Sequence, residues 1–554
     1  MKTAMQCHEI FVRHLHGKIN YITFVMKKNF PFMTMKRIKI LIWLLMTATT
    51  AFSQQFPDTL REFRGVWVAT SKRIDYPAKA TTDANTLKAN YINLLSQFKN
   101  AGYNAVVFQV RPAADAFYKS PYEPWSEWLT GKQGRAPIPE FDPLEFMVER
   151  THSQKMEFHA WFNPFRAVAT TQYADVCATH ITNKKPEWFF SYGGSKYFDP
   201  GIPEVREYLV KIIVDVVSRY DIDAVHFDDY FYPYPVQGDN NKFVEIPDDK
   251  TFQKYKGNFT DKAAWRRNNV NTFVREVNEA IKREKPWVKF GIGPAGVWRN
   301  KREDPDGSET NSLSAYDYLY ADVITWLKNG WIDYAAPQIY WNIKHQYNQF
   351  EKCVKWWDAH AFGRNIYIGL GAYNQESGTV AGWSDPNEIP NQIAITRKYP
   401  HVQGVITYRS TTILKNPMNM VTNVKNKCFS HEVMMPKMPW LENSPLSPDA
   451  TLLRMPNQYV VHWTDNTNRT IPANNKPVFY SVYRVKGKNP DFVPSPKNFL
   501  KFTETCDLRL FHKGRAIFRK KFYTYKITSF NRYHVESAPS KAIIIKYSKK
   551  DRVE

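Results

Sequence analysis

The stretch Asp223-Ala-Val-His-Phe-Asp-Asp-Tyr-Phe-Tyr-Pro233 passes from an apolar strand into paired carboxylates, then into aromatic residues and a proline. Its apolar and polar positions alternate with period two, the pattern of a strand. In a parallel barrel the bulky set, Val225 and Phe227, suits the helix side, which directs His226 and Asp228 inward. Asp228 then lies at the C-terminal mouth, where such barrels hold their chemistry. The sequence predicts a functional carboxylate there, the alternative being a helix N-cap or a loop-closing ion pair.

Around this stretch, strand-like runs alternate with segments of helical period from residue 64 to residue 430. The expected strands are 64–70, 105–112, 157–164, the Asp223 stretch, 289–296, 333–341, 366–372 and 404–409. The expected helices are 84–100, 143–153, 203–219, 261–284, 316–329, 346–360 and 387–399. Eight consecutive units are typical of a (β/α)8 TIM barrel of the α/β class, which we assign to residues 54–430. The longest connections are expected to wall one side of the mouth; they are 113–141, 165–202 and 233–260.

The pattern changes after residue 430. Residues 431–449 contain four prolines and are interpreted as a linker. Residues 450–554 carry short strand-like runs between turn signals, which predict a small all-β sandwich. The expected strands there are 450–454, 459–463, 478–485, 522–529 and 542–546. The run 521–540 resembles the last two strands of a fibronectin type III domain. Because domains with their own cores usually stand alone, a chain ending near Lys425 is expected to fold.

The first 53 residues carry the pattern of an export signal. A basic segment starts at Met35, the apolar run 40–46 follows, and small residues lead to a predicted cut before Gln54. We therefore interpret 35–53 as a signal peptide and 1–34 as an upstream start rather than structure. The apolar run is too short to span a membrane, and no cysteine near the cut could carry a lipid. The expected location is periplasmic or extracellular.

The 554-residue chain has a formal net charge of +23, and 15% of its residues are aromatic. The first 53 residues contribute +7, which leaves about +16 for the rest. No zinc-finger spacing, Arg-rich arm or RNA-binding signature appears, so we expect no nucleic-acid partner. The charge suits an anionic polymer or a charged cell envelope, or it is a merely solvated surface. Abundant aromatic rings suit a sugar-binding cleft, and the oligomeric state stays open.

Five motifs lie in order at predicted strands. They are Arg64-Gly-Val-Trp67, Val107-Phe-Gln-Val-Arg-Pro112, Ala160-Trp-Phe-Asn-Pro164, His226-Phe-Asp-Asp-Tyr-Phe-Tyr-Pro233 and Pro337-Gln-Ile-Tyr-Trp341. Together they resemble the glycosyl hydrolase-like 10 family of exported bacterial barrels, over roughly residues 60–425. The resemblance implies a TIM barrel that hydrolyses glycosidic bonds, with a polysaccharide or glycan strand as its partner. It also implies action on bacterial envelope glycans, including peptidoglycan strands stripped of their peptides, and a fibronectin-like tail is a common companion.

Glycoside hydrolysis usually needs two carboxyl groups, one donating a proton and one acting as nucleophile or as base on water. Asp228 is the first candidate, and we favour Glu376, after strand seven, because strands four and seven face each other across the barrel. Asp229 and Asp115 are held in reserve, since adjacent strand residues such as Asp228 and Asp229 point to opposite sides. For Glu376 a solvent-exposed loop position is the alternative. The acid, the nucleophile or base, and the retaining or inverting outcome stay unassigned.

Other polar and aromatic side chains are expected around these carboxylates. Strand alternation turns Arg111 inward, where it either pairs with Asp228 or Asp115 or awaits an anionic ligand. The candidate substrate-binding residues are Arg111, Trp161, Asn163, Tyr232, Gln338, Tyr340, Trp341 and Tyr373. The aromatic members are candidate platforms for sugar stacking, although any one of them taken singly is more often a core residue.

No HxH, HExxH or Gly-rich phosphate loop appears, so we expect neither a metal nor a cofactor. His226 with Asp228 and Asp229 is the one conceivable cation site. The preferred interpretation is an exported glycoside hydrolase acting on a cell-envelope glycan. Two alternatives stay open: a carbohydrate-binding barrel without catalysis, and a glycosidase for a capsular or dietary polysaccharide. The carboxylates at the predicted mouth favour an enzyme.

Overall fold

The computed structural model describes most of the chain from residue 61 onward. The described residues are 61–169, 176–238, 242–379, 381–438, 440, 445–455, 458–464, 476–511, 520–548 and 552–553. The expected upstream segment 1–34 and signal peptide 35–53 lie outside them. Within these ranges no helix is both long and apolar enough to cross a bilayer.

Parallel strands close into a barrel with eight strand positions, which confirms the predicted (β/α)8 fold. The strands are β1 Phe63–Val68, β2 Ala105–Arg111, β3 Glu157–Phe162, β7 Ala224–Phe227, β8 Lys289–Ile292, β9 Tyr334–Ala335, β10 Gln338–Ile339, β11 Asn365–Gly371 and β12 Val402–Tyr408. The predicted sixth strand, 333–341, is divided into β9 and β10, because Pro337 between them has no N–H to donate. Pairing of β9 with both β8 and β11 closes the ring.

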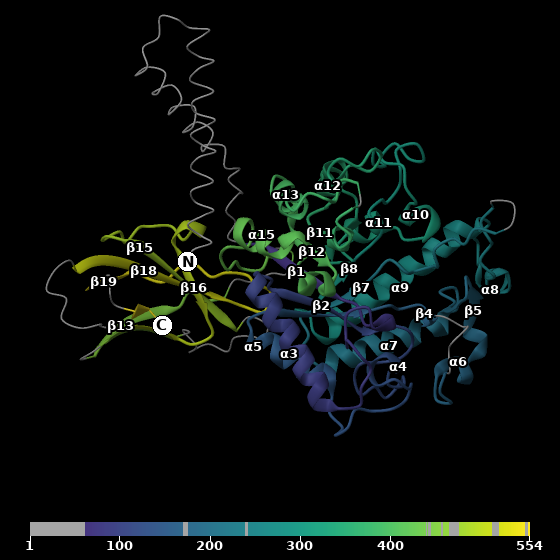
Figure 1. The fold of residues 1–554 in the computed structure, drawn as a ribbon, viewed down its shortest axis with the longest axis horizontal. Coiled ribbons are helices and arrows are strands. Elements are labelled where there is room, and N and C mark those ends of the chain that lie inside the picture. The colour runs from purple at the N-terminus through teal and green to yellow at the C-terminus, as the bar shows by residue number, and fades with distance from the viewer. Residues whose placement is uncertain are drawn as a thin grey trace, which may run out of the picture. The chain divides into compact units, whose positions relative to one another are not determined.

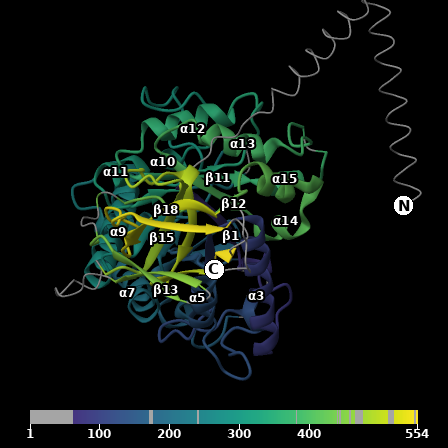
Figure 2. The same ribbon diagram turned by 90° about the vertical axis from the view of Figure 1, so that its left-hand side faces the viewer.

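Helices surround the strands, as Figures 1 and 2 show. They are α3 Ala84–Ala101, α5 Pro143–Ser153, α7 Pro203–Arg219, α9 Lys262–Glu284, α10 Ala315–Tyr318, α11 Val323–Lys328, α12 Phe350–Ala359, α13 Glu388–Thr396, α14 Ser410–Lys415 and α15 Met420–Lys427. The helix expected over 316–329 is two short helices instead. Tyr320 adopts a positive φ of 53° between them, and the Asp322 side chain then caps α11 by accepting from the Thr325 N–H.

The long connections carry secondary structure of their own. The one after β3 holds a three-stranded antiparallel sheet of β4 Arg166–Val168, β5 Phe189–Tyr192 and β6 Ser195–Phe198. The connection after β2 contains α4 Glu127–Thr130, and the one after β7 contains α8 Asp249–Tyr255. All three follow the C-terminal ends of barrel strands and therefore belong to the mouth.

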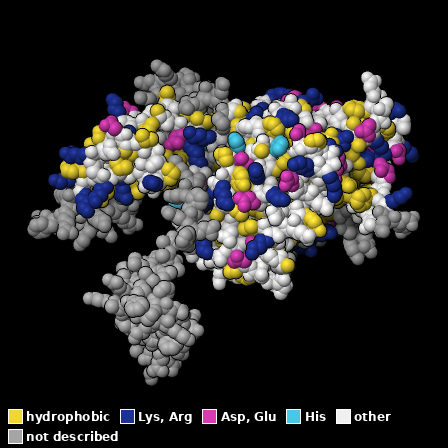
Figure 3. All heavy atoms as spheres, turned by 90° about the horizontal axis from the view of Figure 1, so that it is seen from above, with side chains coloured by type: hydrophobic (Ala, Val, Ile, Leu, Met, Phe, Trp, Pro, Cys, Tyr) yellow, Lys and Arg dark blue, Asp and Glu magenta, His cyan; other side chains and the backbone are white. Residues whose placement is uncertain are grey.

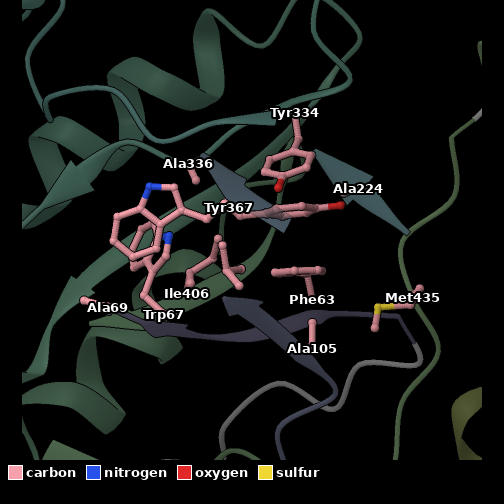
Figure 4. Close-up of a cluster of buried hydrophobic side chains, with 12 residues drawn as sticks. Phe63, Trp67, Ala69, Ala105, Ala224, Tyr334, Ala336, Tyr367, Ile406 and Met435 are labelled. Atoms are coloured by element: carbon pink, nitrogen blue, oxygen red, sulfur yellow. The ribbon is translucent and has the colours of Figure 1, made fainter. Parts of the chain in front are cut away.

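The barrel interior is filled by aromatic rings (Figure 4). The rings of Phe63 and Tyr367 stack with centroids 4.2 Å apart, and Tyr334 lies against both. Gly291 on β8 makes room for the Tyr334 ring, because a Cβ at this position would lie 1.9 Å from a ring carbon. The barrel is a packed core rather than a pore, so a ligand can reach only its mouth.

A chain of hydrogen bonds runs along this interior. The indole N–H of Trp67 donates to His226 Nε2 at 3.1 Å, and His226 Nδ1 lies 3.0 Å from the Tyr334 hydroxyl. That hydroxyl lies 2.9 Å from His159 Nδ1, and His159 Nε2 lies 2.8 Å from a carboxylate oxygen of Glu157. Because Trp67 can only donate and an ionised Glu157 can only accept, the donor of each intervening bond follows. Burial lowers the pKa of both histidines, so each is a neutral imidazole of defined tautomer.

The C-terminal module is formed by two four-stranded antiparallel sheets, β13-β14-β17-β20 and β16-β15-β18-β19 (Figure 2). Their bounds are β13 Asp449–Met455, β14 Gln458–Thr464, β15 Phe479–Lys486, β16 Phe499–Thr503, β17 Asp507–Phe511, β18 Lys520–Phe530, β19 Ile543–Ser548 and β20 Arg552–Val553. Apolar side chains from both sheets, among them Trp463 and Tyr525, form one buried cluster. The sequence patterns located five of these strands and missed β16, β17 and β20.

Residues between the barrel and these sheets pack against the N-terminal end of the barrel, opposite the mouth. The Glu62 N–H donates to the Met434 carbonyl, and the buried Arg64 guanidinium donates to the carbonyls of His431 and Cys428. The indole of Trp440 donates to Asp333 at 2.8 Å. The described residues of the predicted linker therefore pack as a component of the N-terminal end of the barrel.

Ending the chain at Pro448 is expected to leave a folded barrel, whereas ending it at Lys425 is not. The shorter chain loses both carbonyl partners of Arg64, and each unpaired buried donor costs about 1–3 kcal/mol. Thermal unfolding followed by circular dichroism compares the two chains. Equal cooperative unfolding at the same temperature would show that residues 426–448 are dispensable and restore the boundary expected from sequence.

Candidate active site at the mouth of the barrel

Asp228 is the first residue beyond β7, and its side chain lies over the barrel mouth toward β3. One carboxylate oxygen accepts from the indole N–H of Trp161 and from the amide of Asn163, both at 3.1 Å. The other accepts from the Tyr230 backbone N–H at 3.4 Å. Phe227 packs against Phe273 of α9, so the strand phase expected from sequence is confirmed. Trp161, near the end of β3, and Asn163, just beyond it, thus hold Asp228 between them.

Asp229 lies on the other side of Asp228. It accepts hydrogen bonds from the hydroxyl of Tyr234 and from the side chain of Gln338 at β10. Strand alternation would have separated two adjacent aspartates, but β7 ends at Phe227 and the alternation ends with it. The two carboxylates therefore meet at one mouth, one held from β3 and the other from β10.

Burial and mutual repulsion raise the proton affinity of this pair. Burial, with the neighbouring Asp229 charge, raises the pKa of Asp228 to about 7. Burial also raises the pKa of Asp229, whereas the hydrogen bonds from Tyr234 and Gln338 favour its ionised form. The proton of the pair is thus favoured on Asp228, and the negative charge is favoured on Asp229. Unequal carboxyls of this kind are the requirement for acid catalysis beside a stabilised positive charge.

Arg166, at the start of β4, supplies a positive charge to the same mouth. Its guanidinium lies 4.1 Å from the centre of the Tyr230 ring and lowers the pKa of both aspartates. Asn163 fixes the backbone here by accepting from the Arg166 N–H at 3.0 Å. Sequence reasoning missed Arg166, although its position three residues after the inward Asn163 at a strand end was a usable signal.

Three half-buried tyrosines line another part of the mouth. Tyr340 and Tyr408 are stacked with centroids 5.7 Å apart, and Tyr373 meets both rings edge-on at 5.8 and 5.7 Å. Tyr340 and Tyr373 are among the candidate substrate-binding residues named from the sequence. Tyr408, the last residue of β12, is not among them. Trp341 is half-exposed beside His345. These ring faces suit the apolar C–H faces of sugars.

A model of the glycosyl hydrolase-like 10 family matches residues 62–384. The chain belongs to this family. Glycosyl hydrolase YngK of Bacillus subtilis (strain 168) is 40% identical to it over 496 residues, 87% of this chain and 93% of the relative. Glycosyl hydrolase DigH of Escherichia coli (strain K12) is 36% identical over 391 residues, 66% of this chain and 86% of the relative. Among solved structures, the PgaB (BpsB) glycoside hydrolase domain from Bordetella bronchiseptica aligns with 66% of this chain and 98% of its own, at 13% identity and a TM-score of 0.44.

Glu376, the expected partner of Asp228, occupies a different environment in this glycosyl hydrolase-like 10 barrel. It follows the 3-10 helix η5 Ala372–Gln375, and its two carboxylate oxygens bond Thr412 and Lys415, each at 2.5 Å. Arg409 lies 3.8 Å away. Partial burial opposes ionisation, yet Lys415 and Thr412 hold the pKa of Glu376 below its usual range. An ion-paired carboxylate of this kind is a poor proton donor and a weak nucleophile.

Asp115 is a buried residue of the connection after β2. One oxygen accepts from Gln133 at 3.3 Å, and the other has no hydrogen-bond partner among the described residues. Burial raises the pKa of Asp115 to about 7. The structure records no contact between Asp115 and either Asp228 or Asp229 in the described ranges.

Arg111 and Tyr232 lie in the walls of the family barrel rather than in its open mouth. The guanidinium of Arg111 is 1% exposed and forms two bonds of 2.7 and 2.6 Å with Glu123. It also donates to the carbonyls of Asn163 and Pro164 at 2.6 and 3.0 Å. It therefore pairs with Glu123 rather than with Asp228 or Asp115. Through these bonds it links the connection after β2 to the residues that follow β3.

Tyr232 was expected to offer a stacking face, but its side chain is 0% exposed. Its ring lies edge-on to Tyr320 at 5.1 Å, with the Arg266 guanidinium 5.7 Å away. Both faces of the ring are thus covered by protein atoms, because the chain after Phe231 directs this side chain into the packed residues around the mouth. No sugar can stack on it without moving this wall.

His226 is already fully engaged inside the barrel. Trp67 donates to one ring nitrogen and Tyr334 bonds the other, so neither nitrogen faces Asp228 or Asp229 as a free ligand. Across the described ranges, no cluster of three His, Cys, Asp or Glu side chains has the geometry to hold a metal ion.

Proposed function

We propose that this chain is an exported glycoside hydrolase that cleaves glycosidic bonds in a cell-envelope glycan, with peptide-stripped peptidoglycan strands as the preferred substrate. The observation that carries the proposal is the buried pair Asp228 and Asp229 at the barrel mouth, where burial and the neighbouring charge raise the pKa of Asp228 to about 7. Membership in a glycosyl hydrolase-like family and relatives named glycosyl hydrolases support it. Export rests on the sequence pattern of residues 35–53.

In the proposed reaction, Asp228 donates its proton to the oxygen of the scissile glycosidic bond. The bond between that oxygen and the anomeric carbon breaks, and the leaving sugar departs as an alcohol. The ionised Asp229 stabilises the positive charge that develops at the anomeric carbon, and a water oxygen finally bonds to that carbon. The proton lost by this water restores the protonated state of the pair.

The neighbouring residues support these two roles. The side chains of Trp161 and Asn163 both donate to the same oxygen of Asp228, which fixes the orientation of its carboxyl group. Arg166, beside both aspartates, carries a charge suited to the carboxylate of a muramic acid residue or of another acidic sugar. Tyr340, Tyr373 and Tyr408 provide the ring faces expected of a sugar cleft.

The proposal includes the division of the chain into domains. We propose that residues 54–430 form the catalytic barrel and that residues 450–554 form a fibronectin type III-like sandwich. We propose that the Pro-rich segment 431–449 links them, with its described residues packed against the N-terminal end of the barrel. The two packed antiparallel sheets support the assignment of the sandwich.

Digestion of purified glycan strands tests the function. We expect the protein to release oligosaccharides from peptidoglycan strands without peptide stems, and to release much less from strands that keep them, as measured by mass spectrometry. Release from capsular or plant polysaccharides instead would overturn the substrate class. No release from any polymer, with binding retained, would favour a carbohydrate-binding barrel.

A further inference from the structure

The formal charge is unevenly distributed between the barrel and the C-terminal module. Residues 450–554 hold 21 Lys and Arg but only 7 Asp and Glu, a charge of +14. Residues 54–449 hold 47 and 45, a charge of +2. The basic character of the chain beyond its N-terminal segment is therefore almost wholly a property of the smaller module. Figure 3 shows Lys and Arg side chains on its described surface, with few acidic ones between them.

Four lysines gather at one end of the sheet β16-β15-β18-β19, and we call this group the basic end. They are Lys486 and Lys488 at the end of β15, Lys521 on β18 and Lys546 on β19. The strand register places Lys486 opposite Tyr523 and Lys546 opposite Phe522, so the four lysines lie at the same end of three neighbouring strands. Because side chains alternate along a strand, Lys486 and Lys521 lie on the face of Tyr523. Lys488 and Lys546 lie on the face of Phe522. Lys521 is half-buried and the other three are exposed.

No acidic side chain of the described residues pairs with the basic end. Among the described residues, none of the four ammonium groups has a carboxylate within salt-bridge distance, whereas barrel lysines such as Lys262 and Lys282 are paired with aspartates. Two of the four instead lie over one aromatic ring: the ammonium groups of Lys488 and Lys546 are 4.4 and 5.4 Å from the centre of Phe522. Unneutralised like charges gathered at one end of a sheet repel one another, and an anion that binds there relieves that repulsion.

The Phe522 ring holds two of these ammonium groups close together by cation–π contacts. Held in this way, the ammonium groups can pair with carboxylate, sulfate or phosphate substituents of a sugar chain. We propose that the basic end binds an anionic polysaccharide. This binding function is separate from glycoside hydrolysis and does not depend on it.

The basic end lies far from the mouth, which makes it a tether rather than a subsite. The opposite end of the same sheet region contacts the N-terminal end of the barrel, where Arg532 pairs with Asp221 at 2.6 Å and His534 with Glu157 at 2.5 Å. The 11 residues of β18 separate the two ends by roughly 33 Å. Because the barrel itself separates that contact from the mouth, bound polymer raises the local concentration of glycan without entering the cleft.

Binding to immobilised polymers tests the tether without any cleavage. The probes are carboxymethyl-dextran, unmodified dextran of the same length and a double-stranded DNA fragment, and the analyte is the full chain. The test variant replaces the four lysines of the basic end with Gln. The control variant makes the same charge change on exposed barrel lysines that have no salt bridge among the described residues; they are Lys79, Lys211, Lys250 and Lys355.

We expect wild type and control to bind carboxymethyl-dextran equally, and the test variant to bind about tenfold more weakly, as four lost ion contacts imply. Added salt should weaken the wild-type interaction, and plain dextran should bind far less. Equal weakening in both variants would show that only net charge matters and would overturn the proposal. Tighter binding of DNA through the same four lysines would overturn it in favour of nucleic acid.

Discussion

Replacing Asp228 with Asn lowers turnover of a cleavable glycan by on the order of a hundredfold or more, the size of a lost general acid. Asn keeps the shape of the side chain and its contacts with Trp161 and Asn163, so oligosaccharide binding should survive. Initial-rate kinetics and a direct binding measurement separate the two effects. Unchanged turnover in the variant would remove Asp228 from the chemistry.

The pH dependence of the same pair gives a second measurement. Since burial raises the pKa of Asp228 to about 7, its proton is lost as the pH rises through that value. The kcat/KM of the wild type should therefore fall above about pH 7. An activity that stays flat to pH 9 would exclude Asp228 as the proton donor.

Stability provides a control that involves no substrate. A carboxyl group whose folded pKa is raised stabilises the fold below its unfolded pKa of 3.8, and this contribution is lost as the pH rises through about 7. Asn carries no charge at any pH, so the variant does not lose stability through ionisation at this position. The variant should therefore unfold at a higher temperature than wild type at pH 8, with little difference near pH 4. A lower unfolding temperature at every pH would mean that the substitution damaged the fold.

Much of this architecture follows from periodicity alone. The alternation Val225-His226-Phe227 fixed which side of β7 faces α9 and placed His226 inside, as the stacking of Phe227 on Phe273 confirms. The same rule put Trp161 and Asn163 on one face of the predicted strand 157–164, and both contact Asp228. In buried, regular strands each side chain can point in only one of two directions. A single sequence is therefore enough to predict which face of the strand a residue occupies.

The rule fails where strands end or become irregular. Arg111 follows a register shift after Gln109, and its partner Glu123 lies in a connection without periodicity. Tyr408 is a terminal strand residue, and Asp229 is already beyond β7. Mouth residues are therefore the hardest to place from sequence, because their directions depend on loops that pack only in three dimensions.

Replacing Asp229 with Asn is expected to lower turnover about as strongly as Asp228→Asn, whereas Glu376→Gln should cost less than about tenfold. Asp229 shares the mouth with Asp228, and hydrogen bonds from Tyr234 and Gln338 favour its negative charge. The Glu376 carboxylate is already paired with Lys415 and accepts a hydrogen bond from Thr412. Kinetics of the two variants on one substrate make the comparison.

Thermal unfolding separates structural from catalytic effects in the same pair of variants. Lys415 and Thr412 hold the pKa of Glu376 low, so its carboxylate stabilises the fold above the unfolded pKa of 4.5, and this contribution is lost as the pH falls through the folded pKa. Glu376→Gln should therefore unfold at a slightly lower temperature than wild type at pH 7, with a difference that shrinks as the pH is lowered below 4.5, and with turnover largely retained. If Glu376→Gln were inactive with unchanged unfolding while Asp229→Asn turned over normally, the second carboxyl would be Glu376, the partner across the barrel that strand order alone favours.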